Sequence, residues 1–220
     1  MDSACETQSH LVRRACAARL GRISRESFGP AVVLGAAHGA RPQAEALIEQ
    51  VYLRTFASNI TAHFPHMIAT LTPDGRIAGA VGFRWAMEEP LFLEHYLDGP
   101  IEDALAQVRQ EDVTRAQIVE IGNLAANDGA AAVHLFAALA DHVREAGAKY
   151  ACVTATRALR RTFRMFGFET MQLATAAPAR IPGGGKAWGR YYDHDPIVLA
   201  GSVPACRAAL SQRLATENAQ

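Results

Sequence analysis

Apolar segments with the spacing of strands alternate along this chain with apolar segments that have the spacing of helices. This alternation constrains the fold more than any other feature. Residues 116–125 (AQIVEIGNLA) and 150–156 (YACVTAT) have the composition of strands. Between them, residues 130–147 carry the apolar spacing of a long helix that ends at Gly147. Because a strand–helix–strand unit returns through a right-handed crossover, the two strands are expected to pair in parallel.

The rest of the chain continues this mixed pattern. Strands are expected at 31–37, 66–71, 76–86 and 168–176, where the turn TPDG joins 66–71 and 76–86 into a hairpin. Helices are expected at 42–56, 101–108, 157–167 and 203–215, with a loop at 178–196. This order predicts an α/β (α+β) sheet with helices on both faces. Residues 1–28 are expected to form a helical or partly disordered leader attached to one domain of residues 29–220.

Charge and cysteine content exclude several classes of function. The net charge is +0, which argues against a general nucleic-acid binder. The four cysteines are scattered and form no C-x-x-C pair, so we expect reduced thiols, no zinc and a cytoplasmic location. No apolar run approaches the roughly 20 residues that span a bilayer, and arginines at 13 and 14 interrupt any secretion signal. We therefore expect no integral association with a membrane.

Glu120 is the most informative single residue, because it lies inside an apolar strand. Strand alternation places Val119 and Ile121 on one face of the sheet and Glu120 and Gly122 on the other. A buried carboxylate is costly unless it is paired or used. Glu120 is therefore either a group that binds substrate or moves protons, or a carboxylate that an arginine neutralises.

The segment after this strand has two interpretations. Asp128 has the position of an N-cap for the helix that begins near Gly129. The amide groups of such a helix start can also bind phosphate. A P-loop is excluded and the dinucleotide fingerprint is not met, because the glycines are too few. A capped helix is thus favoured over a pyrophosphate site.

Four arginines follow the strand 150–156. Helical spacing places them along one side of residues 157–167, opposite core-facing phenylalanines; they are Arg157, Arg160, Arg161 and Arg164. Such a strip binds an acidic or phosphorylated partner, or it is a solvated helix face.

Two further segments gather groups capable of proton transfer or binding. In residues 88–102, alternation places Glu94 and Tyr96 on one face and His95, a possible base or a structural histidine, on the other. In residues 189–196, Tyr192 and His194 are candidate acid–base groups. Asp193 and Asp195 are spaced like hard-metal ligands, although an Asx-type turn before Pro196 explains them without a metal. Cys152 lies in an apolar strand and is expected to be inert.

Five separated segments resemble the bacterial thermostable hemolysin family in the same order. They are RTFASNITAHFPHMIA, EEPLFLEHYLDGPIE, IVEIGNLAA, TATRALRRTFRMFGF and WGRYYDHDP, and the resemblance covers about residues 30–200. That family is similar to the GNAT-like acyltransferase superfamily, and within it to acyl-homoserine-lactone synthases. Where those synthases carry an Arg-Phe pair, this chain has Asn123-Leu124, so a role of that arginine does not carry over.

The resemblance implies a central mixed sheet whose parallel strands, 116–125 and 150–156, splay apart around the pantetheine arm of an acyl thioester. The implied activity is transfer of a fatty acyl group from acyl carrier protein or acyl-CoA to a small amine, without a metal. Carrier protein is acidic, which gives the arginine strip a purpose. A membrane-active hemolysin and an inactive thioester-binding module are the alternatives.

If the chain is an acyltransferase, as the resemblance implies, individual residues have expected roles. Glu120 is the base or orients the amine, and Tyr192 or His194 protonates the leaving thiolate. Glu94, His95 and Asp193 are candidate contacts to the substrate. The candidate contacts to the acyl donor are Gly122, Asn123, Leu124, Thr154, Arg157 and Arg160.

Overall fold

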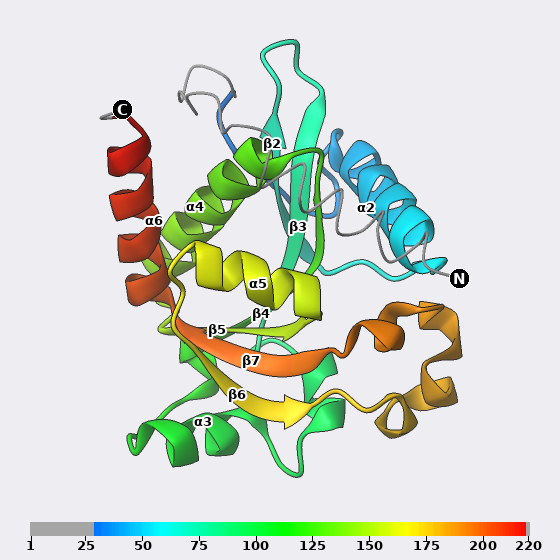
Figure 1. Cartoon of the computed structure of the whole chain (residues 1–220), viewed down its shortest axis with the longest axis vertical. Helices are drawn as coiled ribbons and strands as arrows, with labels where there is room; N and C mark the ends of the chain where they lie inside the picture. The colour runs from blue at the N-terminus through cyan, green and yellow to red at the C-terminus, as the bar shows by residue number, and fades with distance from the viewer. Residues whose placement is uncertain (1–28, 219–220) are drawn as a thin grey trace.

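One mixed sheet organises the chain. The computed structural model describes residues 29–218, so the predicted leader 1–28 lies outside the described residues. The sheet has seven strands in the order β1-β2-β3-β4-β5-β7-β6 (Figure 1). The strands are β1 (Val32–Leu34), β2 (His66–Leu71), β3 (Ile77–Trp85), β4 (Ile118–Ala126), β5 (Tyr150–Ala155), β6 (Thr170–Thr175) and β7 (Ile197–Ser202). β4 and β5 pair in parallel, as the sequence predicts, while the other neighbouring strands pair antiparallel.

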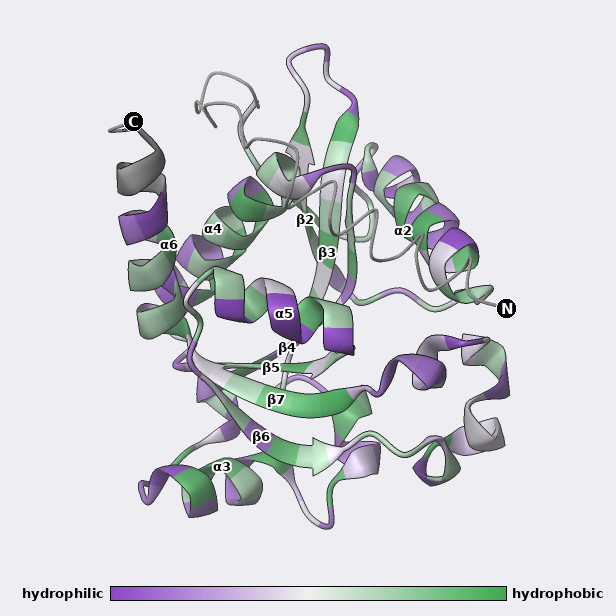
Figure 2. Ribbon diagram, in the orientation of Figure 1, coloured by the Kyte–Doolittle hydropathy of each residue, from purple (hydrophilic) through white to green (hydrophobic). Residues whose placement is uncertain are grey.

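Helices cover both faces of this sheet, which confirms the predicted architecture. The α-helices are α2 (Arg41–Phe56), α3 (Ile101–Arg109), α4 (Gly129–Glu145), α5 (Arg157–Met165) and α6 (Val203–Asn218). The 3₁₀ helices are η2 (Phe92–Tyr96), η3 (Arg115–Gln117), η4 (Pro178–Arg180), η5 (Pro182–Trp188) and η6 (Tyr191–His194). Figure 2 shows that β7 is mainly hydrophobic, whereas α2 and α5 carry hydrophilic and hydrophobic residues in turn.

The core clusters show which elements share a face. Successive residues of a strand point to opposite faces, and Ile118 packs with η2 and α3 whereas Val119 packs with α4. Ala44 and Ile48 of α2 pack on the same face as η2 and α3, further along the sheet. α5 and α6 pack on the α4 face, around an aromatic cluster that includes Phe136. We call these the α2 face and the α4 face.

The sequence interpretation was wrong in two segments. Residues 197–202 form β7, between β5 and β6, where no strand was predicted. The run is short and lies between the predicted loop and the predicted terminal helix, although Gly201-Ser202 and Pro204 mark its boundary with α6. Residues 92–96 form the helix η2 and not an alternating segment, because the spacing of Leu93 and Tyr96 also fits one turn of a 3₁₀ helix.

A bulge in β4 and the end of its pairing with β5 position the site. The β4–β5 pairing stops at Ile121 and Val153. Beyond that point β4 stays with β3 while β5 stays with β7, so the two strands separate. In the β3–β4 ladder, Gly82 pairs with Gly122 but Ala80 pairs with Ala125, which leaves one extra residue in β4. Asn123 takes a left-handed conformation there, with φ of 49°. The splayed parallel strands predicted from the sequence are therefore present.

Candidate functional site

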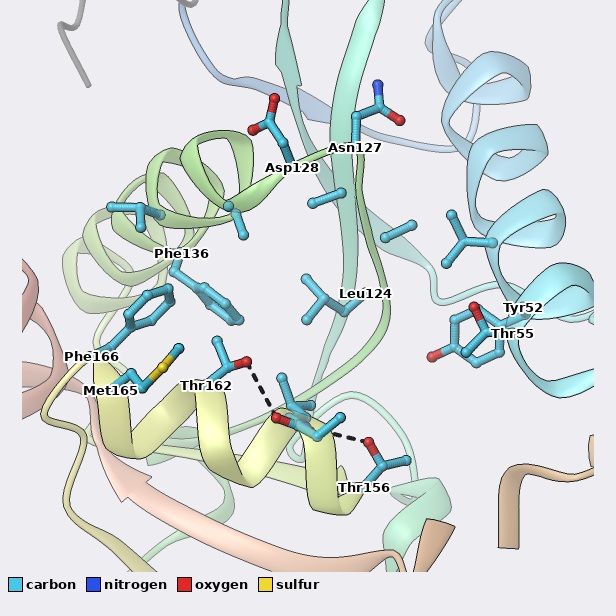
Figure 3. A pocket seen from close by; sticks show the side chains of 18 of the residues that line it. Tyr52, Thr55, Leu124, Asn127, Asp128, Phe136, Thr156, Thr162, Met165 and Phe166 are labelled. Carbon is cyan, nitrogen blue, oxygen red and sulfur yellow. Dashed lines mark hydrogen bonds between the residues drawn. The ribbon is translucent and has the colours of Figure 1, made fainter. Parts of the chain in front are cut away.

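A cavity of about 270 Å³ opens where β4 and β5 separate. Its walls come from α2 on one face of the sheet and from α4 and α5 on the other (Figure 3). Leu124 of β4 and Thr154 of β5 lie between these walls. Since helices on opposite faces line one cavity, it passes through the sheet in the gap between the two strands.

Two tyrosines contact the backbone that this gap leaves without a strand partner. Tyr52 of α2 forms a hydrogen bond with the backbone of Leu124, and burial raises the pKa of its phenol to about 12. The Tyr191 hydroxyl donates to the carbonyl of Thr154 at 2.8 Å. Burial also raises the pKa of Tyr191 well above its usual value. Both phenols are therefore protonated at neutral pH and lie against the wall of the cavity.

The β5 side of the cavity offers hydroxyl groups. The Thr154 hydroxyl is buried and has no hydrogen-bond partner among the described residues. Thr156 caps α5, since its hydroxyl accepts a hydrogen bond from the amide of Leu159 at 3.4 Å. A ligand in the gap would meet an unused hydroxyl at Thr154.

The start of α4 borders the cavity and is already capped. The Asp128 carboxylate accepts a hydrogen bond from the amide of Ala131 at 2.8 Å, which confirms the predicted N-cap. This carboxylate places negative charge where a pyrophosphate would otherwise bind the helix amides. Arg54 and Arg213 line the cavity from other sides.

Glu120 lies on the α2 face, below the root of the gap. Its side chain is 4% exposed, and its two oxygens accept hydrogen bonds from the amides of Phe92 at 2.9 Å and Leu93 at 3.0 Å. The Arg84 guanidinium lies 3.4 Å from the carboxylate. Burial raises the pKa of Glu120 to about 7, although Arg84 and the two amides oppose that shift. Glu120 therefore both anchors η2 and titrates near neutral pH.

Gly122 and Asn123 contact the loop that follows α2. The Asn123 side-chain oxygen accepts a hydrogen bond from the amide of Phe64 at 3.2 Å. A Cβ on Gly122 would lie 2.5 Å from the Phe64 ring, so only glycine fits there. Both residues thus shape the root of the gap from the α2 face.

Glu94 and His95 lie on η2, beyond Glu120. The Glu94 carboxylate accepts hydrogen bonds from the amides of Leu91 and Ile101 and pairs with Arg115 at 2.7 Å. Burial would raise the pKa of Glu94, but these contacts lower it below its usual value. His95 is exposed, and its ring contacts the Phe92 carbonyl. Neither residue lines the cavity.

The candidates in η6 point in different directions. The Tyr192 hydroxyl lies 2.6 Å from that of Tyr96, away from the gap, and burial raises the pKa of Tyr192. The His194 ring lies 5.3 Å from that of Phe56, and burial lowers the pKa of His194. Asp193 is exposed. Neighbouring Tyr191, which was not singled out, is the residue of this segment that lines the cavity.

The arginine strip of α5 divides into two parts. Arg160 turns inward and pairs with Asp195 at 2.8 Å, with its side chain 17% exposed, so it departs from the predicted strip. Arg157 is 70% exposed and lies 3.8 Å from Asp195. Arg161 and Arg164 are exposed, while Phe163 and Phe166 are buried as predicted. Three arginines therefore remain on the open side of the helix.

Residues 29–218 contain neither a cluster of metal ligands nor a helix that could span a membrane. No group of three or more His, Cys, Asp or Glu side chains in this range is placed to bind a metal ion. No helix in the same range has both the length and the apolar character needed to cross a membrane.

Comparisons with known proteins agree with this architecture. The family model for thermostable hemolysin matches residues 34–207. Among solved structures, the AHL synthase LasI is 11% identical with a TM-score of 0.56, covering 82% of this chain and 94% of its own. The CoA-dependent acyl-homoserine lactone synthase MesI is 15% identical with a TM-score of 0.54, covering 84% and 95%. FeeM, an N-acyl amino acid synthase from uncultured soil microbes, is 18% identical with a TM-score of 0.52, covering 82% and 99%. No curated protein sequence matches the chain. At these identities the likeness shows a shared GNAT-like fold.

Proposed function

Because this chain belongs to the thermostable hemolysin family and has a GNAT-like fold, we propose that it transfers an acyl group from a thioester to a small amine. The observation that carries the proposal is the cavity through the sheet, along which the facing edges of β4 and β5 no longer pair with each other. An extended chain with amide groups, such as pantetheine, pairs with such strand edges as an added strand would.

Residues of the gap, together with Glu120 below its root, support a division of roles in this proposal. The amine nitrogen attacks the thioester carbonyl carbon, the carbon–sulfur bond breaks, and the thiolate leaves. Glu120 accepts the proton that the amine loses, because its pKa of about 7 suits a base at neutral pH. Tyr191 gives up its hydrogen bond to the Thr154 carbonyl, donates its proton to the thiolate and regains a proton from solvent; its phenol lines the cavity, whereas that of Tyr192 contacts Tyr96.

Stabilisation of the developing oxyanion requires a donor in the gap. In this proposal the donor is the backbone of Leu124 or the hydroxyl of Tyr52 or Thr154, all of which line the cavity. In the structure Tyr52 already contacts the backbone of Leu124, so a bound thioester would take over or extend that contact. Glu120→Gln is expected to abolish transfer while the protein remains folded.

Charge around the cavity favours carrier protein over CoA as the donor. Asp128 occupies the start of α4, where a pyrophosphate would otherwise find free amides. Arg157, Arg161 and Arg164 are exposed on α5, which forms one wall of the cavity. A carrier protein supplies negative charge over a broad surface, and its pantetheine arm carries a single phosphate group.

The test is to incubate the full chain with decanoyl acyl carrier protein or decanoyl-CoA and a pool of small amines. Released thiol is quantified and products are identified by mass spectrometry. Amide formation that depends on Glu120 is the expected result. Thioester binding without thiol release or amide product would show a binding module and overturn the proposed function, and so would lysis of liposomes without a donor and without any amide product.

A further inference from the structure

Phe64 covers the stretch of β4 that lies between Glu120 and the cavity. On the α2 face, η2 covers Glu120, the Phe64 ring covers Gly122, and Ala125 beyond the bulge lines the cavity. We infer that Phe64 selects the acceptor amine by size, an inference that rests on the proposed acyl transfer.

The ring occupies a slot that two glycines create. Gly82 and Gly122 are directly paired across β3 and β4. A Cβ on Gly82 would lie 2.7 Å from the Cβ of Phe64, and a Cβ on Gly122 would lie 2.5 Å from the far end of the ring. The aromatic ring therefore extends across both strands, and any other residue at either glycine would collide with it.

The backbone of Phe64 is fixed on both sides. Its amide donates to the Asn123 side chain at 3.2 Å, and its carbonyl accepts from the Arg41 guanidinium at 2.7 Å. Arg41 also donates to the carbonyl of Pro65 at 2.7 Å and is 9% exposed. Asn123 lies in the bulge, so the same distortion of β4 that shapes the gap also positions Phe64. A side chain on a fixed backbone is suited to act as a wall.

The ring also adjoins the Arg84–Glu120 pair. The Arg84 guanidinium carbon lies 4.1 Å from the centre of the Phe64 ring, and its Nε lies 3.4 Å from the Glu120 carboxylate. An acceptor amine must reach the Glu120 carboxylate and the thioester carbonyl in the gap at once. The Phe64 ring lies between these two points on the α2 face, so it limits the size of the group that the carbon next to the amine nitrogen can carry.

The experiment compares wild type, Phe64→Ala and Phe64→Leu with a series of amino acid amides from glycinamide to phenylalaninamide, using one decanoyl thioester as donor. Phe168→Ala is the matched control, because Phe168 is also a half-buried phenylalanine but packs on the α4 face. Phe64→Ala is expected to raise kcat/KM for phenylalaninamide relative to glycinamide by about tenfold or more. The KM for the donor should stay unchanged, and Phe168→Ala should keep the wild-type order of amines.

Stability measurements test the position of the Phe64 ring independently of turnover. Gly122→Ala should lower the melting temperature in the wild-type background and far less in the Phe64→Ala background, because the colliding ring is then absent. Equal losses in both backgrounds would show that the ring does not fill the slot, and would overturn the inference. So would an unchanged order of amines in a Phe64→Ala protein that still turns over. If wild type acylates none of the amines, the proposed function itself fails and the inference fails with it.

Discussion

The titration of Glu120 gives a quantitative prediction for the stability of the fold. Burial raises the pKa of this carboxyl from 4.5 to about 7. Since the folded protein binds the proton more tightly than the unfolded chain, the contribution of Glu120 is complete below about pH 4.5 and is lost as pH rises through about 7. One pKa unit corresponds to about 1.4 kcal/mol, so the loss amounts to about 3 kcal/mol.

The variant Glu120→Gln isolates this effect, because it cannot ionise. Unfolding by urea at a series of pH values from 4.5 to 8 gives the free energy of unfolding of each protein. Wild type should lose about 3 kcal/mol relative to Glu120→Gln across that range. Glu145→Gln is the control, since Glu145 lies at the end of α4 with its side chain 71% exposed. A free-energy difference between wild type and Glu120→Gln that stays constant with pH would refute the assignment of a buried, proton-binding Glu120.

Four further results are expected. The rate of acyl transfer should rise with pH through about 7, because only ionised Glu120 accepts a proton; a flat profile in stopped-flow thiol release would contradict this. Tyr191→Phe should lower kcat by about 10²-fold or more in steady-state assays, and Tyr192→Phe should not. Asn123→Ala should cost about 1 kcal/mol or more in urea unfolding, because the partly buried amide of Phe64 loses its acceptor; a cost near zero would count against the contact. Replacing the three exposed arginines of α5 by serine should raise the KM for decanoyl carrier protein about tenfold at low salt. The KM for decanoyl-CoA should stay unchanged. Equal effects on both donors would argue against docking of carrier protein on these arginines.

The parallel pair β4 and β5 at the centre of the fold is predictable, because the sequence patterns that indicate it are continuous and lie between the two strands. The helix between the two strands has a regular apolar spacing, and Asp128 marks its start. A strand–helix–strand unit then leaves one arrangement for β4 and β5. β7 is harder to predict because its apolar run 197–202 is short, and a short apolar run does not distinguish a strand from part of a helix by its spacing.

The site was less predictable, because its contacts join distant parts of the chain. The alternation of residues in β4 identifies Glu120 as an unusual carboxylate. It does not reveal that the amides of Phe92 and Leu93 bind this carboxylate. Tyr191 and Tyr192 are neighbours in sequence, and only the tertiary structure decides which one reaches the cavity.

No sequence pattern around the loop residue Phe64 indicates where its ring packs. Two glycines at 82 and 122, far apart in sequence, were the available hint that something packs closely against adjacent strands. The bulge at Asn123 follows from the register of β3 against β4, which the sequence does not encode locally.

The central claim is that the gap between β4 and β5 binds the acyl donor. Ala132→Trp fills the cavity from its α4 wall, while Ala146→Trp places the same side chain at the exposed end of α4. The direct measurement is release of thiol from a decanoyl thioester in the presence of amine by wild type and these two variants. We expect release by wild type and Ala146→Trp and none by a folded Ala132→Trp. Equal release by all three proteins, or by none of them, would contradict it.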